Sequence, residues 1–207
     1  PGFPPSRPDL PERRQGMPDW DALREHWRAA PKKLVLVGVL PPGEVATALL
    51  DRLVSDPSVV VLTETTSNLH HPGCIPSIDS VMAPLERAEA SGEHFSDLRP
   101  HLLLTFGGMV VSKKIKQFLR DYPPATHWHV DPWRAPDTYY CLDTHYQMTA
   151  GAFLDGLLSI GHEGPAGYRD LWLRLKSAYE SGREDYLARA PFSDMVAFHM
   201  LLEALPG

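Results

Sequence analysis

Cysteine is scarce in this sequence, and long hydrophobic runs and an excess of basic charge are missing from it. The 207 residues include only two cysteines, Cys74 and Cys141, so no disulfide framework is indicated and a cytoplasmic location is expected. No apolar run approaches the roughly 18 residues that span a bilayer, and no signal peptide is visible. The formal net charge of −6 argues against a general nucleic-acid binder, which needs a basic surface.

Recognisable catalytic motifs are missing as well. The sequence holds no G-x-S-x-G elbow, no P-loop and no carboxylate pair at a diagnostic spacing. After the first apolar run, prolines at 41 and 42 replace N–H donors that a pyrophosphate would need. We therefore expect no catalytic residue in this chain. It starts at Pro1 and stops at Gly207, and we expect it to be a piece of a longer protein that is inactive alone.

What the sequence does contain is an alternation of strand and helix patterns. With 43% hydrophobic and 22% charged residues, the chain can bury an ordinary core. The expected strands are 33–38, 59–62, 101–106 and 126–130, with a short fifth one near 139–142. The expected helices between them are 44–54, 77–89 and 110–120. This alternation predicts an α/β fold, a Rossmann-like doubly wound parallel sheet with helices on both faces.

The two ends of the sequence do not follow this alternation. Residues 1–18 hold six prolines and are expected to form an extended linker that joins no ladder. Asp19 is the expected N-cap of a short helix that opens the domain proper, residues 19–150. A C-terminal helical segment follows, with helices expected at 149–160, 165–189 and 193–205. We divide it into an extension, 151–192, and a separate last helix, 193–207.

The last helix combines an N-cap signal with an apolar stripe. Ser193 is the expected cap, and Met195, Phe198, Leu202 and Leu205 recur at spacings of three and four. Burying such side chains contributes roughly 1.5–3 kcal/mol each. We therefore expect the stripe to pack on its own domain or on a second chain.

Two segments are candidates for ligand binding, because both follow a strand at the carboxyl edge of the predicted sheet. The first is the irregular loop 63–76, where Ser67, Asn68 and His70 either bind a ligand or cap their own loop. The second is the turn Gly107-Gly108, which leads into Ser112, Lys113 and Lys114 at the start of a helix.

The two lysines are unusual in a first helical turn, because each opposes the helix macrodipole by roughly 0.3–1 kcal/mol. Such a local conflict at a ligand edge commonly serves function. We interpret free N–H groups, Ser112 and a lysine as a site for a substrate carboxylate, and expect Lys114→Ala to weaken binding more than Lys113→Ala. The alternative is that both lysines extend into water.

Histidines suggest a metal site at first sight. His127, His129 and Asp131 alternate along the strand 126–130 and just beyond it, and so share one face. However, no tight ligand pair such as C-x-x-C or H-E-x-x-H accompanies them, or His70, His71 and Cys74. We expect no metal here, and interpret the strand histidines as polar core residues with hydrogen-bond partners. Asp131 could serve a sugar hydroxyl, as carboxylates at strand ends do in many doubly wound folds.

The segments LVLVG, TSNLHHPG…PSID, LLLTFGGMVVSKKIKQFLR and HWHVD together resemble the central domain of the MenD family, the 2-succinyl-5-enolpyruvyl-6-hydroxy-3-cyclohexene-1-carboxylate synthases. The closing FSDMVAFHMLLEALPG resembles the helix that opens the family's diphosphate-binding domain. The resemblance covers roughly residues 33–205, and the G-G-x-x-x-S-K-K run is its most specific part.

The resemblance implies a thiamine-diphosphate and Mg²⁺-dependent transferase of menaquinone biosynthesis, usually a homo-oligomer. Such an enzyme decarboxylates 2-oxoglutarate and adds the succinyl unit to isochorismate. The chain would be its middle domain, without the cofactor motifs, and would contribute a basic residue to the substrate site, Lys113 or Lys114. Together with the loop and helix-start residues named above, the expected substrate-binding residues are Ser112, Lys113, Lys114, Ser67 and Asn68. The alternatives are a stand-alone Rossmann-like module for an adenine nucleotide and a scaffold without a ligand.

Overall fold

One parallel sheet of seven strands organises the computed structural model, which describes residues 12–14, 17–87, 91–161 and 163–205. The strands are β1 (Glu12–Arg14), β2 (Lys33–Val37), β3 (Val59–Leu62), β4 (Cys74–Ile75), β5 (Leu102–Phe106), β6 (Thr126–Val130) and β7 (Thr144–Tyr146). Their spatial order is β1-β7-β6-β5-β2-β3-β4. The chain therefore builds outward from β2 to β4, then restarts at β5 on the other side of β2. This reversal makes the β2–β5 boundary the topological switch point, beside which such folds bind ligands.

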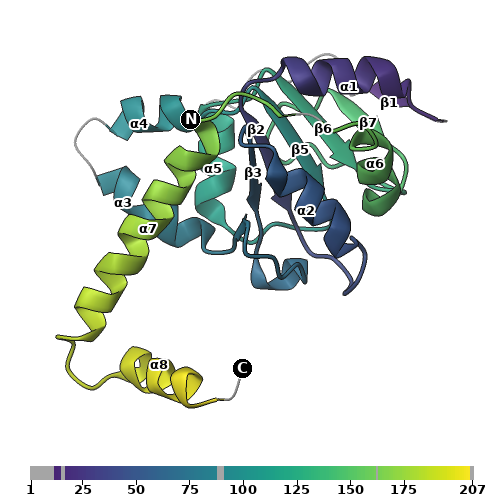
Figure 1. The fold of residues 1–207 in the computed structure, drawn as a ribbon. Coiled ribbons are helices and arrows are strands. Elements are labelled where there is room, and N and C mark those ends of the chain that lie inside the picture. The colour runs from purple at the N-terminus through teal and green to yellow at the C-terminus, as the bar shows by residue number, and fades with distance from the viewer. Residues whose placement is uncertain (1–11, 15–16, 88–90, 162, 206–207) are drawn as a thin grey trace.

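Helices cover both faces of the sheet (Figure 1). The helices are α1 (Trp20–Ala29), α2 (Thr47–Ser55), the 3₁₀ helix η1 (Thr65–Ser67), α3 (Ile78–Arg87), α4 (Ser91–Leu98), α5 (Lys113–Asp121), α6 (Ala150–Leu157), α7 (Tyr168–Leu187) and α8 (Asp194–Ala204). Side chains of α1, α2 and α6 pack on one face, and side chains of α3, α5 and α7 pack on the other. The predicted doubly wound α/β fold is confirmed. Among the described residues, no helix combines the length and apolar character that a membrane span requires.

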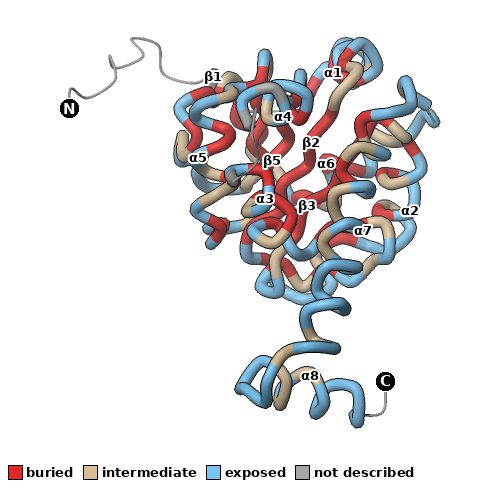
Figure 2. Tube along the Cα trace, turned by 90° about the vertical axis from the view of Figure 1, so that its left-hand side faces the viewer, coloured by how far each residue is buried: buried red, intermediate tan, exposed pale blue. Residues whose placement is uncertain are grey.

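The central strands are buried on both sides, as Figure 2 shows. Along β2, Val35 and Val37 enter the core under α1, α2 and α6, while Leu34 and Leu36 enter the opposite core. All four are fully buried. Side chains of a strand alternate between the two faces of its sheet, so a strand covered on both faces is apolar at most positions. This requirement explains why the apolar runs of the sequence predicted β2, β3 and β5.

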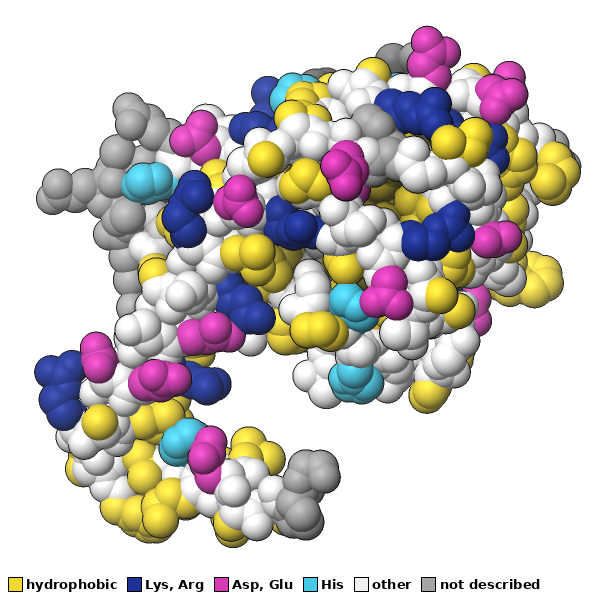
Figure 3. Space-filling model, viewed as in Figure 1, with side chains coloured by type: hydrophobic (Ala, Val, Ile, Leu, Met, Phe, Trp, Pro, Cys, Tyr) yellow, Lys and Arg dark blue, Asp and Glu magenta, His cyan; other side chains and the backbone are white. Residues whose placement is uncertain are grey.

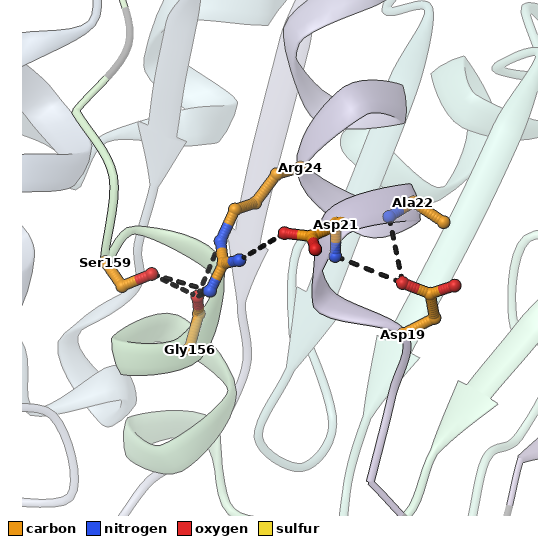
Figure 4. Close-up of polar contacts among 6 residues, drawn as sticks. All are labelled: Asp19, Asp21, Ala22, Arg24, Gly156 and Ser159. Atoms are coloured by element: carbon orange, nitrogen blue, oxygen red, sulfur yellow. Dashed lines mark hydrogen bonds and ion pairs between the residues drawn. The ribbon is translucent and has the colours of Figure 1, made fainter.

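Polar contacts cap the start of α1 and join this helix to the end of α6 (Figure 4). Asp19 is the N-cap of α1, as predicted, and its carboxylate accepts two backbone N–H bonds of 3.1 and 3.2 Å. Arg24 donates to the carbonyl of Gly156 from Nε (3.2 Å) and Nη2 (2.8 Å), and to Ser159 Oγ (2.6 Å). A cation at a helix C-terminus complements the dipole, so Arg24 stabilises the end of α6 against α1.

Two predictions about strands are wrong. The fifth strand is not at 139–142 but at Thr144–Tyr146. Residues 139–142 turn instead, because Asp137 accepts the N–H groups of Cys141 (2.9 Å) and Leu142 (3.0 Å), and Tyr140 adopts a positive φ of 60°.

The second wrong prediction is that residues 1–18 join no ladder. Glu12–Arg14 pairs in parallel with β7 as an edge strand. No proline lies within these three residues, so their N–H groups can enter a ladder at an edge. Residues 1–11 and 15–16 of the predicted linker lie outside the described residues.

The expected burial of the last helix is also wrong for this chain. Met195, Phe198, Leu202 and Leu205 are 47%, 66%, 68% and 64% exposed. The physical reason is that α7 leads α8 away from the body of the domain (Figures 1 and 2), so that the stripe reaches no core surface. Figure 3 shows the resulting concentration of hydrophobic side chains at α8. Ser193 holds the N-cap position, but its side chain makes no capping bond.

Candidate functional site

A cavity of about 260 Å³ opens at the carboxyl ends of β5 and β6, beside the switch point. The turn Gly107-Gly108 forms one wall, and the segment that follows β6 forms another. Its polar lining consists of Thr105, Lys116, His129, Asp131, Arg134 and Thr138. Burial raises the pKa of Tyr139 well above its usual value, so this wall residue presents a neutral phenol. The edge predicted from the sequence therefore does carry a cavity with several polar side chains in its lining.

Backbone contacts at the switch point bring the loops after β2 and β5 together. Gly38 N–H donates to the carbonyl of Phe106 (3.0 Å), and Gly108 N–H donates to the carbonyl of Val39 (2.7 Å). A Cβ on Gly38 would lie 2.0 Å from the carbonyl oxygen of Gly108, and Gly107 has a φ of +81°. Only glycine allows this approach. The two loops are thus fixed to each other by backbone hydrogen bonds beside the cavity.

Two cations at the cavity were not singled out from the sequence. Lys116 Nζ donates to the carbonyl of Val110 (3.0 Å), and Arg134 follows Asp131, whose carboxylate accepts the N–H groups of Trp133 (2.7 Å) and Arg134 (2.9 Å). For Lys116 a signal was available, because it lies one helical turn beyond the lysine pair and so shares a side with Lys113. Arg134 gave no such signal, since its position depends on a loop.

The residues at the start of α5 are arranged differently from the expectation. Ser112 is the N-cap, and its Oγ accepts the N–H of Ile115 (3.2 Å) while donating to Asp79. The N–H groups of Val111 and Ser112 donate to the two carboxylate oxygens of Glu64, each at 2.7 Å. These two N–H groups are therefore not free, because Glu64 of the same chain accepts from both.

The two lysines have different surroundings. Lys113 is exposed, and within the described part of the chain it forms no ion pair. Lys114 is half-buried and pairs with Glu86 of α3. Lys113 thus has the ammonium that is available to a ligand, whereas a ligand of Lys114 would have to compete with a carboxylate.

Ser67 and Asn68 hold their own loop. Ser67 is fully buried, accepts the N–H of Glu64 (2.9 Å) and donates to the carbonyl of Val37 (2.8 Å). Asn68 has a positive φ of 50° and donates from Nδ2 to the carbonyl of Leu40 (2.7 Å). These bonds cap the loop itself, which is one of the two interpretations that the sequence left open.

The strand histidines are polar core residues with partners, as predicted. Thr105 Oγ1 lies 2.8 Å from His127 Nε2 and 2.8 Å from His129 Nδ1, and Cys141 Sγ lies 3.8 Å from His127 Nδ1. Burial lowers the pKa of His127 to about 3, and burial also lowers the pKa of His129 to about 4 against the opposing charge of Asp131. The described residues contain no group of three or more His, Cys, Asp or Glu side chains placed to hold a metal ion.

The lowered pKa values predict that acid destabilises the fold. Unfolded histidines take up protons near pH 6.5, whereas folded His129 and His127 do so only near 4 and 3. The unfolded state therefore binds more protons in this window, and the free energy of unfolding falls as pH drops from about 6.5 to 4, by up to about 1.4 kcal/mol per pH unit for each histidine.

Urea denaturation at several pH values measures this slope. The slope should fall by about half in His127→Phe, where only His129 of this pair is left to contribute, and should be unchanged in the control His70→Gln, whose imidazole is exposed. A slope that His127→Phe leaves unchanged would contradict the assignment of the acid effect to this pair.

Large apolar side chains surround the same edge of the sheet. Val39, Met109, Val111 and Trp133 follow the carboxyl ends of β2, β5 and β6, and all are exposed, Trp133 by 86%. Exposed apolar groups that gather beside a polar cavity are typical of surfaces that another protein or domain covers. This edge has the composition of an interface as well as that of a ligand site.

Known proteins that share one name are similar in sequence to this chain over nearly all of its length. It is 39% identical over 199 residues to 2-succinyl-5-enolpyruvyl-6-hydroxy-3-cyclohexene-1-carboxylate synthase of Christiangramia forsetii, covering 96% of this chain and 34% of that protein. The proteins of the same name from Flavobacterium johnsoniae and Porphyromonas gingivalis are 39% and 33% identical, over 90% and 93% of this chain. The chain spans about a third of the length of these relatives. No family model matches it.

Proposed function

This chain belongs to the family of 2-succinyl-5-enolpyruvyl-6-hydroxy-3-cyclohexene-1-carboxylate synthases, of which it spans about a third, and we propose that it is their central domain. The match to the relative from Christiangramia forsetii over 96% of this chain, and a single α/β sheet with helices on both faces, support this. In the proposed division, residues 1–18 are a linker, 19–150 the domain proper, 151–192 a helical extension and 193–207 the first helix of the next domain. The whole protein would act as a homo-oligomer in the cytoplasm.

The composition of α8 supports this division. Six apolar side chains in α8 and just after it are exposed, and they lie on several sides of the helix: Met195, Phe198, Met200, Leu201, Leu202 and Leu205. A helix that is apolar all round is characteristic of the interior of a larger body. We infer that α8 is buried against a part of the whole protein that lies outside this chain, which would explain why these side chains are exposed here.

The proposed reaction of the whole protein is decarboxylation of 2-oxoglutarate and addition of the succinyl unit to isochorismate, in the synthesis of menaquinone. Thiamine diphosphate with Mg²⁺ would supply the carbanion chemistry. The residues of this chain do not fit that cofactor: the sequence lacks a G-D-G motif, and the described residues offer no acidic cluster for a metal ion. The cofactor would therefore lie on the other domains.

The contribution proposed for this chain is positive charge at the carboxyl edge of its sheet. Both substrates carry two carboxylates, and Lys113 and Lys114 are the proposed substrate-facing cations. The other residues predicted with them, Ser112, Ser67 and Asn68, hold the backbone of the neighbouring loops. Lys113 is exposed, whereas Lys114 pairs with Glu86. We therefore propose that Lys113 has the larger role, the reverse of the order expected from the sequence. The exposed apolar residues at this edge fit a surface that faces the catalytic domains.

Calorimetry tests the assignment of the cofactor to other domains. We expect thiamine diphosphate and Mg²⁺ to give no binding heat with this chain, and a clear binding isotherm with the whole protein under the same conditions. NAD and ADP should not raise the melting temperature of the chain, because bound ligands stabilise only a folded state that has a site for them. A micromolar dissociation constant for thiamine diphosphate with the chain alone would overturn the proposed division.

A further inference from the structure

The first turn of α5 has an electrostatic conflict that is resolved from outside the helix. Lys113 and Lys114 oppose the positive end of the helix dipole, and this turn contains no acidic residue. The missing carboxylates come from other elements instead: Glu64, after β3, accepts the N–H groups of Val111 and Ser112 at 2.7 Å each, and Asp79 of α3 accepts from Ser112 Oγ. The positive helix end is thereby neutralised, although its own residues add positive charge.

Glu64 is itself held firmly to the sheet. Its N–H donates to Ser67 Oγ (2.9 Å), and the fully buried Ser67 donates in turn to the carbonyl of Val37 at the end of β2 (2.8 Å). In the order β5-β2-β3, this chain of bonds runs from β3 over the end of β2 to the loop after β5. The position of the first turn of α5 is therefore coupled to the central strand through Ser67 and Glu64.

The body of α5 does not depend on this link. Ile115, Phe118 and Leu119 are buried in the core shared with α3 and α7. Loss of the Glu64 carboxylate should therefore loosen the loop and the first turn, where Lys113 lies, and leave the rest of the helix in place. The effect on Lys113 would be positional, because Glu64 contacts the backbone of the turn and no contact with the lysine ammonium is involved.

We propose that Glu64 is a positioning residue that presents the Lys113 ammonium to the anionic substrate, an inference that rests on the function proposed above for Lys113. Glu64 fixes the backbone next to Lys113 through two charge-assisted hydrogen bonds and offsets the repulsion between the lysine and the helix end. The ammonium of Lys114 is held by the carboxylate of Glu86, so its position does not depend on Glu64.

Steady-state kinetics of the whole synthase with isochorismate and 2-oxoglutarate tests this proposal. Glu64→Gln should raise KM for one of the two substrates on the order of tenfold, with a smaller change in kcat, because a correctly placed cation contributes mainly to binding. In a Lys113→Ala background, Glu64→Gln should add less than about twofold, since residues that act through one group are not additive. The matched control is Asp121→Asn, which removes a carboxylate at the other end of α5, where it binds Gln117.

The outcomes separate the two proposals. If Lys113→Ala leaves KM unchanged, the function proposed for Lys113 fails and the role of Glu64 fails with it. If Lys113→Ala raises KM while Glu64→Gln does not, or if the two effects multiply in the double variant, only the positioning role of Glu64 is overturned.

Amide hydrogen exchange provides a readout that does not depend on activity. Glu64→Gln should speed exchange at Val111 and Ser112 and leave Phe118 and Leu119 protected, which also shows whether the variant is folded. Unchanged protection at Val111 and Ser112 would overturn the proposal.

Discussion

Replacing Gly38 by alanine is expected to destabilise this fold more than the same replacement at either of the other two glycines of the switch point, Gly107 and Gly108. The new Cβ would lie 2.0 Å from the carbonyl oxygen and 2.8 Å from the carbonyl carbon of Gly108. Both are backbone atoms that the hydrogen bond from Gly108 N–H to Val39 holds in place. Because the two loops cannot separate without breaking this hydrogen bond, we expect a loss of about 3 kcal/mol or more in the free energy of unfolding, at or above the upper end of what overpacking typically costs.

Gly108→Ala is the matched control for this prediction. A Cβ on Gly108 would meet its nearest neighbour, Val39 Cβ, at 3.4 Å, which is close to ordinary contact. Urea denaturation of both variants should give a loss of less than about 1 kcal/mol for Gly108→Ala. Equal losses in the two variants would contradict the close backbone approach at the switch point.

Asp56→Asn is expected to have the second largest effect, because it leaves a buried ammonium without a counter-ion. Lys33 Nζ is fully buried, 3.3 Å from Asp56 Oδ2 and 2.5 Å from Ser58 Oγ. Burial lowers the pKa of Lys33, and the charge of Asp56 opposes that change. Removing one partner of a buried ion pair typically costs about 3–5 kcal/mol.

Removing the lysine instead of the carboxylate should lower the free energy of unfolding by less. In Lys33→Met, the carboxylate of Asp56 still accepts from Ser58 N–H (2.9 Å), Ser58 Oγ (2.6 Å) and Gly164 N–H (2.9 Å). Burial alone would raise the pKa of Asp56, but these bonds and the charge of Lys33 lower it. The double variant should recover part of the loss of Asp56→Asn, since no charge is then left buried.

Thermal and urea unfolding measure these differences, and an exposed ion pair supplies the control. Arg52 and Asp155 lie 3.7 Å apart with side chains 40% and 76% exposed, so Asp155→Asn should cost about 0–1 kcal/mol. An equally small loss in Asp56→Asn would show that the buried pair is not needed for stability.

The strands and the order of elements could be predicted because their physical cause is local. A strand covered on both faces is apolar at most positions, and β2, β3 and β5 show this in the sequence itself. In β6, Trp128 and Val130 enter the core on one face, whereas His127 and His129 lie on the other face. β4 is only two residues long, Cys74–Ile75, and gives no periodic signal. β1 was missed because its three residues lie in a proline-rich segment, where pairing depends on the distant partner β7.

The candidate site could be located from the sequence, but its hydrogen bonds could not. Gly107-Gly108 and the first turn of α5 do lie at the carboxyl edge beside a cavity. The capping of that turn by Glu64, 47 residues away from Val111, depends on the order of strands in the sheet. The ion pair of Lys114 with Glu86 depends likewise on the packing of α3 beside α5. Periodicity and propensity carry no information about such contacts.

The most direct test of the proposed function is the KM of the whole synthase for isochorismate and 2-oxoglutarate in Lys113→Ala. We predict a rise on the order of tenfold for one substrate, unchanged affinity for thiamine diphosphate, and a smaller rise in Lys114→Ala. Lys176→Ala is the control, because this lysine of α7 pairs with Glu180 away from the carboxyl edge. If Lys113→Ala and Lys114→Ala both leave the two KM values within about twofold of the unchanged enzyme, the lysines are solvated surface residues and this domain does not bind the substrate through them.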